Sequence, residues 1–129
     1  MAEQIANFRF QNFLVTETHI TIEPTDKENN SLSINIEQNA YENEEEHKMK
    51  LELNVIVKDE ENTVNINVKV VGLFEYDENV TGEAKDVFFK LNAPAILFPH
   101  VRAYVTALTA MSGMAPIILP TINLASSRQ

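Results

Sequence analysis

The sequence predicts a single α+β domain, in which a four-stranded antiparallel sheet, arranged as a meander, is followed by helices that pack on it. Three observations predict this fold. A chain of 129 residues suits one domain with its own core. From residue 8 to residue 76, apolar and polar residues alternate with the two-residue period of half-buried strands. From about residue 95 to residue 112, apolar residues recur at three- and four-residue steps, which is typical of a helix.

The first strand is expected over about residues 8–23, and Pro24 and the polar residues after it end it. The apolar residues that share one parity are Phe8, Phe10, Leu14, Ile20 and Ile22. Phe13 and Val15 fall on the other parity. The pattern therefore indicates that both faces of this strand are covered in its middle.

The other three strands are expected over about residues 31–37, 47–58 and 62–76. The third alternates most regularly, with Met49, Leu51, Leu53, Val55 and Val57 on one face. Short turns between such strands are typical of an antiparallel sheet with one wet face. Before the third strand, the glutamates between Glu42 and Glu46 predict a solvated loop, because like charges packed so closely repel one another.

Two helices are expected, a short one over about residues 83–91 and a long one over about 95–112. The long helix carries apolar residues at helical spacing, including Phe98, Val101, Val105 and Leu108. Pro94 predicts a break between the two helices, and Pro99 fits only the first turn of the second. Gly113 ends the helix, and the proline-containing residues after it are expected to be extended.

Charge and composition exclude several classes of function. A net charge of -9 argues against binding to nucleic acid, because no basic stripe is present to replace counterions. The chain has no cysteine, so it has neither disulfides nor thiolate metal sites. Residues 1–10 do not resemble a signal peptide, and four prolines interrupt the apolar region 91–124, which argues against a membrane span. A cytoplasmic location is expected.

No residue pattern indicates catalysis or a cofactor. The histidines, His19, His47 and His100, are scattered without the spacing of metal ligands, so no metal site is expected. The chain contains no nucleophile-elbow, phosphate-binding or dinucleotide-binding glycine motif. An enzyme is therefore disfavoured.

The segment Asn92–Leu124 is almost wholly apolar, and Arg102 is its one charged residue. One sheet and one helix face bury only part of such a surface, and the remainder marks an interface with another copy or with a client. Methionine and phenylalanine adapt to varied partners, which favours binding of unfolded segments. A structural or adaptor subunit, with this surface permanently buried, is the alternative, and a small-ligand site is a third.

The motif Ile96-Leu97-Phe98-Pro99, followed by Arg102, resembles the hallmark of the SecB export chaperones. Similar pieces are Ile20–Pro24, Gly72–Phe74 and Leu119–Leu124. The resemblance implies a sheet with a long helix, assembled as a dimer of dimers, that binds unfolded preproteins in apolar grooves and delivers them to the SecA motor.

The resemblance also implies which residues act. The implied peptide-binding groove comprises Phe74, Tyr76, Phe88, Phe89, Ile96 and Leu97. The implied oligomer interface comprises Val101, Tyr104, Val105, Leu108 and Met111. Glu23 matches one acidic residue expected to contact SecA, whereas His19 stands where another is expected.

The sequence also departs from the family where members carry a second helix and a polar tail, since it stops five residues beyond Leu124. A chaperone dedicated to one partner, such as an antitoxin, is therefore the alternative within the family.

Overall fold

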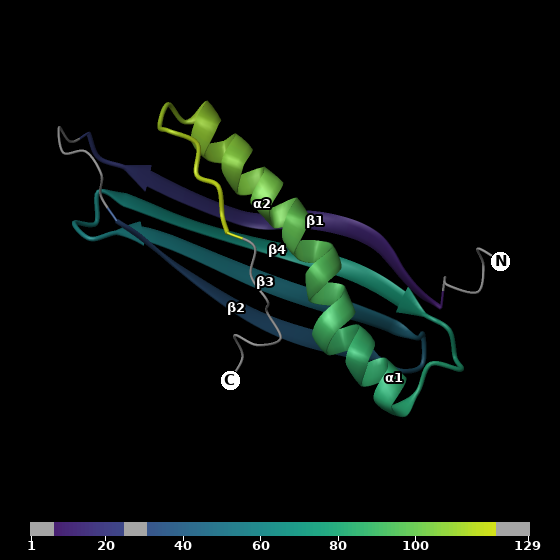
Figure 1. The fold of residues 1–129 in the computed structure, drawn as a ribbon. Helices are drawn as coiled ribbons and strands as arrows, with labels where there is room; N and C mark the ends of the chain where they lie inside the picture. The colour runs from purple at the N-terminus through teal and green to yellow at the C-terminus, as the bar shows by residue number, and fades with distance from the viewer. Residues whose placement is uncertain (1–6, 25–30, 121–129) are drawn as a thin grey trace.

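A computed structural model describes residues 7–24 and 31–120. A four-stranded antiparallel sheet lies beneath one long helical stretch that crosses one of its faces (Figure 1). In chain order the elements are β1 (Phe8–Ile22), β2 (Leu32–Asn43), β3 (Lys48–Asp59), β4 (Val64–Tyr76), α1 (Gly82–Val87), the π-helical segment η2 (Phe88–Asn92) and α2 (Ala93–Met111). The predicted order, strands first and helices last, is confirmed.

The strand order in the sheet is β1-β4-β3-β2. The expected meander is therefore correct for β2, β3 and β4 but wrong for β1, which crosses to the far edge and pairs with β4. This order places the two strands with the strictest apolar alternation, β3 and β4, at the centre of the sheet. Their inward side chains supply most of the core.

Two β-bulges in β1, at positions 11 and 16, change which face its side chains occupy. After the first bulge, Phe13 and Val15 pair with Gly72 and Val70 and so lie on the helix-covered face. Leu14 lies on the opposite face and is 43 % exposed. The expectation that both faces of β1 are covered is therefore wrong, because an inserted residue reverses parity without changing the sequence pattern on either side.

Strand β2 is longer than expected, because it continues to Asn43 instead of ending near residue 37. Its pairing with β3 runs without interruption from Leu32 to Asn43. The predicted acidic loop shrinks to a turn over residues 44–47, which His47 closes with a positive φ of 55°. Backbone pairing with a central strand therefore outweighs the polar composition of residues 38–43.

The two predicted helices are joined, and the expected break before Pro94 is wrong. The segment η2 takes its place, and the Ala93 N–H donates to the Phe88 carbonyl five residues earlier. Proline cannot donate and crowds the carbonyl four residues before it, so a widened turn lets the helix continue. Because α2 begins at residue 93, Pro99 lies inside it and not in its first turn as expected.

The core lies between α2 and the inward faces of β3 and β4. Its fully buried side chains include Met49, Leu51, Leu53, Val68, Val70, Phe74, Leu97, Val101 and Val105. The helix approaches closely at Gly72, where an added Cβ atom would lie 3.0 Å from Leu97 Cδ1. Glycine at this position therefore sets how near α2 can come to β4.

A glycine-containing cap ends α2 as predicted. Gly113 has a φ of 89°, and its N–H donates to the Ala110 carbonyl at 3.4 Å. The Met114 N–H donates to the Thr109 carbonyl at 3.4 Å. These two bonds form a Schellman motif, which reverses the chain so that the next residues run back along the helix (Figure 1).

The returning segment 115–120 is held by three side chains on one face of α2. Arg102 Nε donates to the Leu119 carbonyl at 2.9 Å, and Thr106 Oγ1 donates to the Ile117 carbonyl at 2.8 Å. The Ile117 N–H donates to Thr109 Oγ1 at 2.8 Å. Because these helix residues lie four and three positions apart, they share a face. Ile117 and Leu119 are buried as a result.

Replacing Thr109 with valine should destabilise the chain by about 1–3 kcal/mol, since valine keeps the shape but leaves the buried Ile117 N–H without an acceptor. Urea unfolding followed by circular dichroism measures the change, and amide exchange at Ile117 should accelerate. The exposed Ser112→Ala change is the control, with an expected effect within about 0.5 kcal/mol. A Thr109→Val variant as stable as the wild type would show that this bond does not hold the segment.

Candidate functional site

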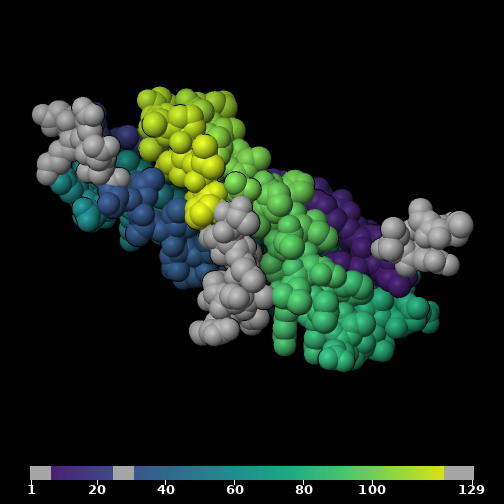
Figure 2. Space-filling view, viewed as in Figure 1, coloured from purple at the N-terminus to yellow at the C-terminus, as the bar shows by residue number. Residues whose placement is uncertain are grey.

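The inward face of β2 is the part of the sheet that the helix leaves uncovered. Helix α2 packs mainly on β4 and β1. Leu32, Ile34, Ile36, Gln38 and Ala40 point to the helix side of the sheet, since they pair with inward residues of β3. In Figure 2, atoms of β2 are exposed beside the helix and the returning segment. We call this surface, the inward residues 32–40 of β2, the β2 trough.

A small cavity lies at one end of the β2 trough, between the sheet and η2. Its volume is about 200 Å³. It is lined by Gln38, Ala40, Leu51, Asp86, Phe89 and Lys90. The floor comes from the strands and one wall from the helical residues. Gln38 lines this cavity, and its Oε1 atom is buried, with no donor within residues 7–24 and 31–120 that reaches it.

A larger cavity of about 580 Å³ lies at the other end of the trough. It is lined by Ile22, Glu23, Pro24, Leu32, Ile34, Asp59, Thr63, Val64 and residues 114–118. Asp59 serves the nearby turn: hydrogen bonds from the Thr63 hydroxyl, and from the backbone N–H groups of Thr63 and Val64, lower the pKa of Asp59 against the opposing effect of burial. What this end offers a ligand is therefore mainly apolar surface.

Of the residues implied to form the groove, three are buried within the chain and three are not. Phe74, Tyr76 and Leu97 are at most 2 % exposed. Phe88, Phe89 and Ile96 are partly buried.

The aromatic residues among these form an aromatic cluster at η2, which consists of two groups of rings in contact. The Phe8 ring stacks between Phe74, at 5.1 Å between centroids, and Phe88, at 4.6 Å. Tyr76 meets Phe89 edge-on at 5.9 Å. Contact between this cluster and a client stays a prediction, and Phe89 is the member that lines the small cavity.

The residues implied to form an oligomer interface divide in the same way. Val101 and Val105 are buried against the chain's own sheet. Tyr104 and Leu108 are partly buried, and the Tyr104 hydroxyl hydrogen-bonds with Thr18 Oγ1 at 2.9 Å. Met111 is 86 % exposed. Their role in assembly stays a prediction, and Met111 offers the most surface to a second copy.

Glu23, implied as a SecA contact, follows β1 directly and is exposed. Its N–H donates to the Thr63 carbonyl at 2.7 Å, which fixes the backbone beside the larger cavity. Nothing in this geometry tests a contact with SecA, so that role also stays a prediction.

A polar cluster that the sequence did not reveal fastens α1 to the sheet. Glu42, at the end of β2, accepts hydrogen bonds from the Tyr76 hydroxyl and from Lys85 Nζ, the latter at 2.7 Å. Lys85 also lies 3.6 Å from Glu44 and over the Tyr76 ring. Residues 38–43, Q-N-A-Y-E-N, do not alternate between polar and apolar, so the sequence carries no signal that Glu42 belongs to a strand.

The ionisation of this cluster follows from its contacts. Burial acts to raise the pKa of Glu42, but hydrogen bonds from Lys85 and Tyr76 outweigh it, so the pKa is lowered. Burial, followed by the hydrogen bond to Glu42, raises the pKa of Tyr76 to about 12. The same carboxylate raises the pKa of Lys85. Near neutral pH the cluster is therefore an ion pair with a neutral phenol, which suits a structural clasp.

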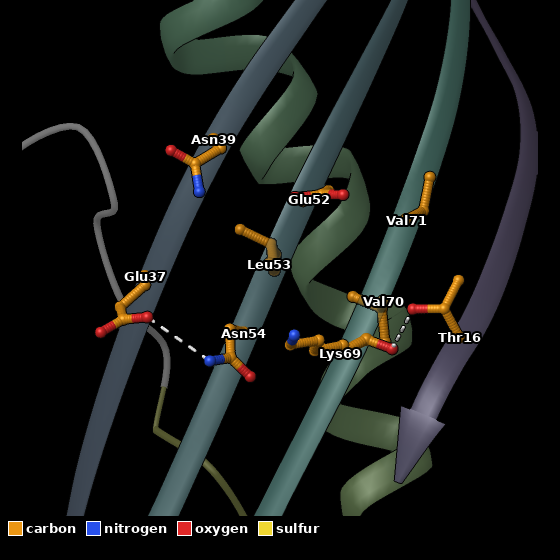
Figure 3. Close-up of a pocket in the computed structure, with 9 residues that line it drawn as sticks. All are labelled: Thr16, Glu37, Asn39, Glu52, Leu53, Asn54, Lys69, Val70 and Val71. Carbon is orange, nitrogen blue, oxygen red and sulfur yellow. Dashed lines mark hydrogen bonds between the residues drawn. The ribbon is translucent and has the colours of Figure 1, made fainter.

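The opposite face of the sheet carries a polar hollow of about 170 Å³, with the helix behind the strands (Figure 3). Asn54 Nδ2 donates to Glu37 Oε1 at 3.4 Å, and Thr16 Oγ1 donates to the Lys69 carbonyl at 3.3 Å. These two bonds join neighbouring strands, and the side chains drawn do not converge on one point (Figure 3). This face offers less apolar surface than the β2 trough.

His47 and His100 pack against different aromatic rings and do not share a site. His100 Nδ1 lies 3.2 Å from the Ile96 carbonyl, and its ring packs on Phe10 and Phe13. His47 packs edge-on against Tyr76. In the part of the chain that the structure describes, no three histidine or acidic side chains gather as metal ligands. Over the same residues, no helix has both the length and the apolar character needed to cross a bilayer.

Comparison with known proteins agrees with this fold. The family model described as "Preprotein translocase subunit SecB" matches residues 12–127. An uncharacterised protein of Methanocaldococcus jannaschii is 31 % identical over 124 residues, which cover 91 % of this chain and 79 % of that protein. The protein-export protein SecB of Orientia tsutsugamushi (strain Boryong) is 24 % identical over 124 residues, which cover 96 % of this chain and 76 % of that protein. The resemblance expected from the sequence motif is confirmed.

One solved structure has a similar fold. The SecB-like chaperone Rv1957 of Mycobacterium tuberculosis, in complex with a ChAD peptide from the HigA1 antitoxin, matches with a TM-score of 0.76. The match covers 94 % of this chain and 95 % of that one at 15 % sequence identity. The predicted α+β fold, a four-stranded antiparallel sheet followed by a long helix, is confirmed.

Replacing Tyr76 with phenylalanine should cost about 2 kcal/mol at pH 8, because the ring stays but the hydrogen bond to Glu42 is lost. The pKa of this phenol rises from 10.0 to about 12 on folding, so its stabilising effect is complete below pH 10 and is lost as pH rises through 12. Urea unfolding of both proteins between pH 8 and pH 12 measures the difference. A difference that stays constant over this range would contradict the clasp.

Proposed function

This chain belongs to the SecB family, and from that premise we propose that it is a chaperone that holds unfolded polypeptides along the β2 trough. The observation that carries the proposal is an apolar sheet face that continues beyond the helix. Ile34 and Ile36 extend the core outward but stay only partly buried, and Leu32 is 40 % exposed. An exposed apolar surface of this kind is typical of a binding site.

The geometry of β2 suits an extended client. Inward side chains recur every second residue, about 6–7 Å apart, which is also the repeat of an extended peptide. As an edge strand, β2 pairs on one side with β3. Its other edge can hydrogen-bond to the backbone of a client, which gives affinity without reading a particular sequence. Broad specificity for unfolded chains follows from such a site.

The charge of the chain selects among clients. The net charge of -9 keeps an apolar surface in solution and favours apolar segments that also carry basic residues. The proposed mechanism is holding without turnover, so client release depends on the binding equilibrium and not on a nucleotide. Unfolded preproteins kept competent for export are the client class that the family suggests.

Assembly, a SecA contact and a cytoplasmic location complete this proposal. Met111 and Ile118 are 86 % and 72 % exposed, and Leu91 is 48 % exposed. A second copy of the chain would remove such large apolar side chains from water, which supports a homo-oligomer such as a dimer of dimers. For SecA, the support is the position of Glu23, exposed at the end of β1.

A second candidate is a chaperone, or an adaptor subunit, dedicated to one partner. The specific observation in its favour is the solved SecB-like chaperone of similar fold, which is in complex with an antitoxin peptide. A photoreactive residue placed at Phe89, which lines the small cavity, separates the candidates by crosslinking in cells. Many crosslinked nascent chains support general export, whereas one recurrent product supports the dedicated role.

Replacing Ala40 with glutamate should weaken client binding about ten-fold, because Ala40 is exposed in the β2 trough and a carboxylate there opposes apolar contact. Light scattering measures how much chaperone prevents a urea-unfolded polypeptide from aggregating on dilution. The wild type should act at about stoichiometric amounts.

The matched control is Asn39→Glu, which adds the same charge one residue away on the opposite face of β2. It should leave the activity unchanged. Equal losses in both variants would mean that charge alone matters and that the trough is not the site. No suppression of aggregation by the wild type would argue against the chaperone function as a whole.

A further inference from the structure

Gln38 is an unusual residue for its position in β2. It lies between Ile36 and Ala40 on the inward face of the strand and pairs with Leu53, which is fully buried. Its Oε1 atom is buried, and among the described residues no donor reaches it. Nearly all buried polar groups in proteins find a partner, so an unpaired carbonyl at this position requires an explanation.

The cavity beside Gln38 has the size of a site for one side chain. Its volume of about 200 Å³ is below the roughly 300–1,000 Å³ of pockets that hold whole small ligands. Ala40, Leu51 and Phe89 line it with apolar surface. An apolar side chain that carries a hydrogen-bond donor fits this combination of lining and acceptor.

The cover of this cavity is the least firmly packed part of the helical stretch. Neither α1 nor η2 contains a buried residue. Two cavity residues from this stretch, Asp86 and Lys90, are exposed. Small movements of these side chains therefore cost little burial and can widen the cavity beside Gln38. Short π-helical segments such as η2 occur frequently at functional sites.

We propose that this cavity is a specificity pocket of the β2 trough, which takes one client side chain with an uncharged O–H or N–H group that donates to Gln38 Oε1. Asp86 and Lys90 carry opposite charges on the same cavity, so the lining gives no strong preference for a cation or an anion. Tyrosine and tryptophan meet both requirements, since each joins a large apolar ring to a single donor. This inference rests on the proposed function.

Two fluorescent nine-residue peptides test the pocket. In both, valine alternates with serine, and the central residue is either tyrosine or phenylalanine. The wild type should bind the tyrosine peptide about two- to ten-fold more tightly, the range expected for one hydrogen bond. Gln38→Met keeps the length of the side chain but removes the acceptor, so it should bind both peptides equally. Fluorescence anisotropy measures the four dissociation constants.

Asn39→Met is the matched control, because it makes a similar change on the other face of the same strand. It should keep the preference for tyrosine. Equal binding of both peptides by the wild type, or a preference that survives in Gln38→Met, would overturn the pocket but leave the chaperone proposal standing. Failure of the wild type to bind either peptide would overturn both.

Thermal unfolding of the free chain gives an independent readout. If Gln38 is retained for binding, then Gln38→Met should raise the Tm by about 2–5 °C, because it removes a buried carbonyl without a partner. A residue with a purely structural role would lower the Tm when replaced, and that result would count against the proposal.

Discussion

The structure depends on a mismatch of widths between one helix and four strands. Strands lie about 4.8 Å apart, so the outer two are separated by roughly 14–15 Å before side chains are counted. A helix with its side chains is about 10–12 Å across. A single helix therefore cannot cover the whole inward face of this sheet. Helix α2 packs mainly on β1 and β4, and the apolar face of β2 is left at the edge.

The chain reduces this uncovered surface by folding its own later residues back over the sheet. The motif around Phe98 and Arg102 acquires a physical meaning here. Leu97 and Phe98 anchor α2 in the core, and one turn later Arg102 holds the returning segment through the Leu119 carbonyl. Further along the helix, Thr106 donates to the Ile117 carbonyl and Thr109 Oγ1 accepts from the Ile117 N–H. One face of α2 therefore supplies apolar side chains to the core, and another face holds the returning segment 115–120 by hydrogen bonds.

At the end of the trough near Ala40, the helical residues of α1 and η2 pack on the sheet through a different set of contacts. Segment η2 packs through partly buried aromatic rings, and α1 is fastened by the ion pair between Lys85 and Glu42. A partly exposed ion pair adds little stability, and neither α1 nor η2 contains a buried residue. The structure therefore combines a rigid centre, where α2 meets Gly72, with a looser end next to the small cavity. That difference in packing supports the proposal that this site admits varied polypeptides.

The sequence by itself determined the fold class, the inward residues of β3 and β4, the end of the long helix and the family, since each is written in a local period or motif. It could not give the strand order or the bulges in β1, because pairing partners and inserted residues leave the local alternation unchanged. Two sequence predictions, the end of β2 near residue 37 and the helix break before Pro94, were wrong for a similar reason. Pairing with β3 and a widened helical turn outweigh local propensity at these positions. For the site, the family resemblance drew attention to Phe89, but only the tertiary structure decided that Phe74 and Leu97 are enclosed while β2 stays open. Which apolar surface remains exposed depends on how wide the covering layer is, and that is a property of the assembled layers.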